Sequence, residues 1–123
     1  MAARIELSEE QIADAIERGE FGTDILRSKK NVAVFMSQSW CPQWLMVDRW
    51  LSAMADSPDL NIYVVVYDQK SYFRKFMSFK ESVFGNDQVP YIRYYVDGAL
   101  VKETNYTSKD FFCEAFGLKY CVE

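Results

Sequence analysis

The chain contains one stretch from which the rest of the sequence can be interpreted: Val32-Ala33-Val34-Phe35-Met36-Ser37-Gln38-Ser39-Trp40-Cys41-Pro42-Gln43-Trp44. It opens with an uninterrupted apolar run, which is typical of a strand covered on both faces. Pro42 follows the cysteine directly, and proline suits the first turn of a helix because its missing N–H would have no partner there. We therefore expect Cys41 at the start of a helix, where backbone N–H groups and the helix dipole favour thiolate over thiol.

A cysteine in this position indicates redox chemistry. A second cysteine three residues further on would complete a CxxC pair, but this position is Trp44. Cys41 therefore cannot form that disulfide. A thiolate here could still attack a disulfide or a peroxide, and an outside thiol such as glutathione would then resolve the product.

Composition narrows the functional classes. A chain of 123 residues with 50% apolar residues fits one globular domain, residues 1–123. The 14 basic and 18 acidic residues give a net charge of −4, which disfavours nucleic acid as a partner. The one basic concentration, at helical spacing, is interpreted as a solvated face: Lys70, Arg74, Lys75 and Lys80.

The chain has no histidine, which excludes Cys/His and Ser/His dyads and most zinc sites; we expect no metal and no cofactor. No apolar run is long enough to span a membrane, and the N-terminus does not resemble a signal peptide, so we expect a cytoplasmic protein with no membrane partner. Three widely spaced cysteines fit reduced thiols. Cys113, on an apolar helix face where free cysteine behaves as a small hydrophobe, and Cys121, near the chain end, are the other cysteines that could resolve Cys41.

Hydrophobic spacing predicts a β-α-β-α-β-α-β-β-α order. The expected strands are 4–7, 31–37, 62–67, 91–96 and 99–104, with Asp97-Gly98 as a hairpin turn. The first expected helix is capped by Ser8 and Gln11 and ends near Gly19, and a further helical piece follows at 21–30. A third helix begins after Cys41 and ends at 56–59. The last two are expected at 70–84 and, after Ser108, at 109–116. A helix between the two long apolar strands predicts a parallel βαβ unit.

With this order of elements the chain resembles the thioredoxin family. The resemblance is carried by Trp40-Cys41-Pro42, by Val89-Pro90 before a strand and by Asp97-Gly98 in the hairpin, within elements that cover nearly all of residues 4 to 118. It implies an α/β thioredoxin-like fold with a central mixed sheet of four to five strands flanked by helices. It also implies that Pro90 is a cis-proline beside Cys41 and that an extended peptide or a small thiol docks along Val89.

The chain departs from the family pattern at several positions. Trp44 replaces the resolving cysteine, and Phe35 stands where thioredoxins usually carry a buried acid. Cys41-Pro42 looks more like glutaredoxin, although the glycine pair that glutaredoxins use for glutathione is missing. Tyr106 takes roughly the place of a small residue in the loop that borders the thioredoxin groove.

Three hypotheses follow for the candidate site, which consists of Cys41 as the catalytic residue and, as substrate-binding residues, Trp40, Pro42, Trp44, Val89, Pro90 and Tyr106. The first is a monothiol thiol–disulfide protein that acts on protein thiols or disulfides, or on an extended peptide in the groove beside Pro90, with glutathione as a further partner. The second is a redox-inactive module that binds a protein partner in the same groove. The third is a monothiol enzyme linked to glutathione or peroxide.

Overall fold

The computed structural model describes residues 4–54 and 57–118. Along these residues the elements are β1 (Arg4–Glu6), α1 (Glu9–Arg18), α2 (Thr23–Leu26), β2 (Asn31–Ser37), α3 (Pro42–Ala53), β3 (Leu60–Val66), α4 (Phe73–Ser82), β4 (Tyr91–Val96), β5 (Ala99–Thr104) and α5 (Lys109–Ala115). No helix among them is long and apolar enough to cross a bilayer.

The strands form one mixed sheet in the order β1-β3-β2-β4-β5. β3 is parallel to both β1 and β2, so the predicted βαβ unit around α3 is confirmed. β4 runs antiparallel to β2 and to β5, as expected for the hairpin. The hairpin turn places Asp97 at φ 52° and Gly98 at φ 83°, which are backbone angles that an Asp-Gly pair adopts readily.

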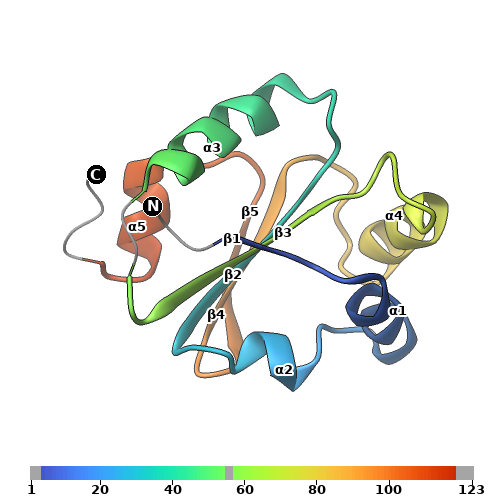
Figure 1. Ribbon diagram of the computed structural model, residues 1–123, viewed down its shortest axis with the longest axis horizontal. Helices are drawn as coiled ribbons and strands as arrows, with labels where there is room; N and C mark the ends of the chain where they lie inside the picture. Colours follow the sequence, from blue (N-terminus) through green and yellow to red (C-terminus); the bar gives the residue numbers. More distant parts are fainter. Residues whose placement is uncertain (1–3, 55–56, 119–123) are drawn as a thin grey trace.

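Helices cover both faces of the sheet (Figure 1): α1 and α4 lie on one side, and α3 and α5 lie on the other. The alternation of side chains along β2 separates two apolar cores, because Val32, Val34 and Met36 join one cluster while Ala33 and Phe35 join the other. Every residue of β2 is buried, which explains why its sequence is apolar almost throughout.

Most predicted helices are present, with shorter limits. Ser8 and Gln11 form the expected capping box at α1, and Gly19 ends that helix at φ 85°. Of the helical piece expected at 21–30 only the single turn of α2 exists. The helix expected over 70–84 begins at Phe73. The predicted end of α3 includes Asp56, which lies outside the described residues, although Met54 already has extended backbone angles.

Candidate functional site

Cys41 occupies the N-cap position of α3, with extended backbone angles of φ −73° and ψ 119°. Pro42 is the first residue of the helix, as its sequence position predicts. The Cys41 N–H donates to the Gln38 carbonyl at 3.3 Å, and the Cys41 carbonyl accepts from the Leu45 N–H at 3.2 Å. These bonds fix the backbone that carries the sulfur between the end of β2 and the first turn of α3.

The sulfur points at the backbone of the segment that precedes β4. Cys41 Sγ lies 3.6 Å from the Val89 carbonyl oxygen, a distance at which the thiol donates a hydrogen bond. The Val89–Pro90 peptide bond is cis. Val89 is half-buried and contacts both apolar cores, whereas Cys41 is only 4% exposed. Three of the site residues identified from the sequence, Cys41, Val89 and Pro90, thus lie together.

The side beneath the sulfur is aromatic and uncharged. Trp44 is 4% exposed and belongs to the same apolar cluster as Cys41. Its ring packs on Phe35 with centroids 6.3 Å apart, and Phe35 in turn contacts Phe112 and Trp50. Trp44 is therefore part of the support below Cys41 rather than an exposed contact residue. Phe35 has no acidic group, so it cannot assist proton transfer at Cys41.

The outer side of the site is apolar and exposed. Trp40 is 63% exposed, and its Nε1–H donates to Gln38 Oε1 at 2.6 Å. Pro42 is exposed, and so are Leu45 at 55% and Met46 at 56% on the first turn of α3. Side chains of this kind around a cysteine provide a surface on which a partner could be held by apolar contact.

The loop that carries Trp40 is tied to the loop after β3. The Ser39 hydroxyl and backbone N–H donate to the two oxygens of the Asp68 carboxylate, at 2.6 and 2.9 Å. Partial burial would raise the pKa of Asp68, but the hydrogen bonds from Ser39 outweigh this effect and lower it below the usual value. Gln38 Nε2 donates to the Tyr67 hydroxyl at 3.3 Å, a second contact between the loops. Neither anchor was expected from the sequence.

Tyr106 lies in a different part of the surface. It is 41% exposed and lines a pocket with Thr107, Ser108 and Phe111. This pocket does not include Cys41 or Val89. Among the predicted site residues, Tyr106 is therefore the one that lines a separate pocket, away from Cys41 and Val89.

Lys80 contradicts the prediction of a solvated basic face. It is fully buried, whereas Lys70, Arg74 and Lys75 are exposed as expected. The sequence does carry a signal for this burial, because Lys80 falls four residues after Phe76 and thus on the buried side of the helix. Its ammonium group contacts the segment that leads to Val89.

Cys113 also differs from the expectation of three reduced thiols. It is buried and disulfide-bonded, so it has no free thiol with which to resolve a mixed disulfide at Cys41. Cys41 is a free cysteine. Cys121, the other resolving candidate, lies outside the described residues. The cytoplasmic location relied partly on reduced cysteines and stays a prediction.

Comparison with solved structures identifies the fold. A mutant thioredoxin from Halobacterium salinarum NRC-1 matches with a TM-score of 0.67 and 14% identity, over 98% of this chain and 95% of that chain. Thioredoxin O1 from Arabidopsis thaliana in its oxidized state matches with a TM-score of 0.59 and 13% identity, over 91% and 93% of the two chains. Trxlp from Edwardsiella tarda matches with a TM-score of 0.57 and 18% identity, over 95% and 100%.

These similarities define the class of structure: the chain has a thioredoxin-like fold, with a five-stranded mixed sheet flanked by helices. At 13–18% identity the likeness concerns the fold alone. No family model matches the sequence, and a search of curated proteins finds no relative.

Proposed function

We propose that this protein is a thioredoxin-fold thiol–disulfide protein that works through one cysteine, Cys41, in the cytoplasm. The observation that carries the proposal is the position of Cys41 Sγ at the N-terminus of α3, 3.6 Å from the Val89 carbonyl oxygen. A sulfur so placed combines the electrostatic influence of a helix start with a neighbouring backbone acceptor that a peptide could share.

The reaction consists of two exchange steps. The Cys41 thiol first loses its proton to solvent, because the chain has no histidine and Phe35 replaces the nearby acid. The thiolate then attacks one sulfur of a partner's disulfide; a bond forms between the two sulfurs, and the partner's other sulfur leaves as a thiolate. An external thiol such as glutathione, as its thiolate, then attacks the partner's sulfur in the mixed disulfide: a new disulfide forms between these two sulfurs, and Cys41 leaves as a thiolate. One sulfur of the partner has then been reduced to a thiol, and the external thiol has been oxidised to a disulfide with the other.

The Val89 carbonyl links the ionisation of Cys41 to the binding of a peptide. In the thiol form Cys41 donates its S–H to this oxygen, whereas the thiolate has no proton to donate. Ionisation therefore frees a backbone acceptor next to the sulfur, and an extended peptide could pair its N–H with it. Exposed Trp40 and Pro42 border the same position and would contact the residues that flank the partner's cysteine.

Mass spectrometry after incubation with oxidised glutathione tests the proposal. We expect one glutathione adduct per chain under native conditions, removable by dithiothreitol and absent in Cys41→Ser. We also expect little insulin reduction with dithiothreitol, since Trp44 stands in place of the resolving cysteine. An adduct that persists in Cys41→Ser, or no adduct on the native wild-type protein, would contradict the proposal.

A second candidate is a redox-inactive module that binds a protein partner in the same groove. It is favoured by the 4% exposure of Cys41 beside the exposed side chains of Trp40, Leu45 and Met46. In this case Cys41→Ser would leave partner binding unchanged, while Trp40→Ala would weaken it. The two candidates thus predict opposite consequences for loss of the sulfur.

A further inference from the structure

Lys80 on α4 is a charged side chain that is fully enclosed by protein. Lysine is almost never buried to this degree unless its ammonium group is paired, because removal of the charge from water is costly. Lys80 Nζ donates to the carbonyl oxygens of Asn86 and Gln88, at 2.8 and 2.7 Å. It also lies 5.5 Å from the centre of the Tyr91 ring. The charge is therefore compensated by two backbone carbonyls and one aromatic face.

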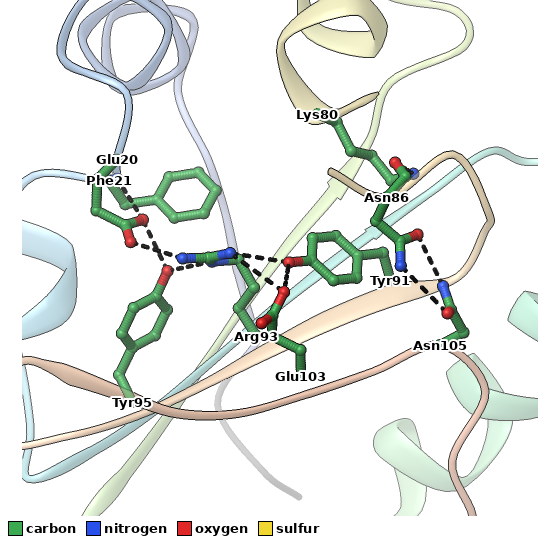
Figure 2. A network of polar contacts seen from close by, with 9 residues as sticks. All are labelled: Glu20, Phe21, Lys80, Asn86, Tyr91, Arg93, Tyr95, Glu103 and Asn105. Carbon is green, nitrogen blue, oxygen red and sulfur yellow. Dashed lines mark hydrogen bonds and ion pairs between the residues drawn. The ribbon is translucent and has the colours of Figure 1, made fainter. Parts of the chain in front are cut away.

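The two carbonyls belong to the segment that leads directly to Val89. Figure 2 shows a second anchor on the same segment, a pair of side-chain amides that joins Asn86 to Asn105 from the loop after β5. Asn105 Nδ2 also donates to the Pro90 carbonyl oxygen at 3.1 Å, and Asn86 Oδ1 accepts from the Gln88 N–H at 3.0 Å. Residues 86–90 are thus held from α4 and from the loop after β5.

We propose that Lys80 is a positioning residue for Cys41: its buried ammonium group fixes residues 86–88 and thereby holds the Val89 carbonyl against the sulfur. The effect of Lys80 on exchange with a peptide rests on the proposed function of Cys41. The effect of Lys80 on the conformation of residues 86–88 can be measured even if that function is wrong.

The burial of the Lys80 ammonium group favours a positioning role for this side chain over a stabilising one. Burial lowers the pKa of Lys80 to about 8, despite the opposing influence of Glu81 and Asp87. Enclosure of the ammonium group therefore costs free energy, and a methionine could fill much the same volume without this cost. What methionine cannot do is donate hydrogen bonds to the two backbone carbonyls of Asn86 and Gln88. The role of the charge is to specify the conformation of residues 86–88.

The test compares Lys80→Met with Lys75→Met, which makes the same substitution at an exposed position of α4. The first measurement is the rate of Cys41 alkylation by iodoacetamide at neutral pH. Because Lys80→Met removes hydrogen bonds from a charged donor, we expect alkylation to become faster by about tenfold or more. The second measurement is the equilibrium constant for a mixed disulfide with a disulfide-bonded model peptide, which we expect to fall by a similar factor. Lys75→Met should change neither value by more than about twofold.

A titration with urea below the unfolding transition separates loop release from general destabilisation. If the loop alone is released, the excess alkylation rate is present without urea and changes little as urea is added. A rate that rises with urea along the slope of global unfolding would overturn the proposal, as would equal rates in the two variants. If Lys80→Met does not fold, Lys80→Leu, which likewise has no hydrogen-bond donor, is measured in the same way with the same expected directions.

The two proposals can fail separately. If the wild-type protein forms no mixed disulfide, the exchange function is wrong, and the alkylation ratio still decides the role of Lys80. If the mixed disulfide forms equally well in wild type and Lys80→Met and alkylation is unchanged, the exchange function stands and the positioning role is wrong.

Discussion

Arg93 Nη2 lies 2.8 Å from Glu20 Oε2, so a guanidinium on the α1 face of β4 is joined to the loop that follows α1. Figure 2 shows the rest of this network: Arg93 Nε donates to the Tyr95 hydroxyl at 2.6 Å and Nη1 to the Tyr91 hydroxyl at 2.8 Å. The Tyr91 hydroxyl donates to Glu103 on β5. Arg93 is only 7% exposed, so one buried cation on β4 joins the loop after α1 to β5.

Removal of this cation should destabilise the fold strongly. Arg93→Met leaves two tyrosine hydroxyls and the Glu20 carboxylate without their common donor, and we expect a loss of about 3 kcal/mol in the free energy of unfolding. Urea denaturation measures the change. Arg74→Met, at an exposed position on α4, is the control and should change stability by less than about 0.5 kcal/mol. Similar stability of the two variants would show that the network contributes little.

The same network predicts a loss of stability in alkaline solution. Burial and the hydrogen bond with Glu103 raise the pKa of Tyr91 from 10.0 to about 12, and burial also raises the pKa of Tyr95. In the unfolded chain these hydroxyls lose their protons first, so stability is fully present below pH 10.0 and falls as the pH rises toward about 12. Tyr91→Phe should lose stability less steeply over this range, as measured by urea denaturation at a series of pH values. Equal slopes for the two proteins would contradict this assignment.

Asp68 should make the free energy of unfolding depend on pH in acidic solution. Its pKa lies below the usual 3.8, because the Ser39 hydrogen bonds outweigh the effect of partial burial, so folding favours the carboxylate. This contribution is present above pH 3.8 and is lost as the pH falls through the lowered pKa. We expect Asp68→Asn to be less stable than wild type at neutral pH and the difference to shrink below pH 3.8. A difference that is constant with pH would show that the charge of Asp68 is not involved.

Most of the architecture could be predicted from the spacing of apolar residues and from the residues that begin or end helices and turns. The apolar run from Asn31 to Ser37, the Asp97-Gly98 turn and the Ser8 cap each act through local geometry, and each is found where it was expected. The piece over 21–30 was overestimated, because the local pattern carries no information on how much helix the packing of Ile25 and Leu26 requires. One turn is enough to bury these two side chains.

The site was predicted only in part, since its anchors depend on contacts between distant segments. Cys41 and Val89 are 48 residues apart, and their proximity was expected only through the family resemblance. The contact between Ser39 and Asp68 joins the loop before Cys41 to the loop after β3, and no sequence motif pairs these two residues. Lys80 is the instructive case: its charge suggested a solvent-exposed face, although its position in the helical repeat placed it with Phe76 on the buried side. For a long side chain, position in the repeat can outweigh charge if backbone carbonyls are available.

Trp40 is the residue with which partner binding can be tested independently of stability. Its ring is 63% exposed and its Nε1–H bonds only to the neighbouring Gln38, so Trp40→Ala should change the free energy of unfolding by less than about 1 kcal/mol. If the exposed side chains around Cys41 contact the partner, the same substitution should weaken mixed-disulfide formation with a disulfide-bonded peptide by about tenfold, as is common for a tryptophan at the centre of an interface.

Phe111→Ala is the matched control for this experiment, because Phe111 is 67% exposed and lines the separate pocket with Tyr106. It removes an exposed aromatic ring of α5 without touching the surroundings of Cys41. The equilibrium constant with the peptide, measured by mass spectrometry after acid quenching, should remain at the wild-type value. If Phe111→Ala weakens the complex as much as Trp40→Ala, the peptide follows a path along α5 and the pocket beside Tyr106, and a contact surface centred on Trp40 is wrong.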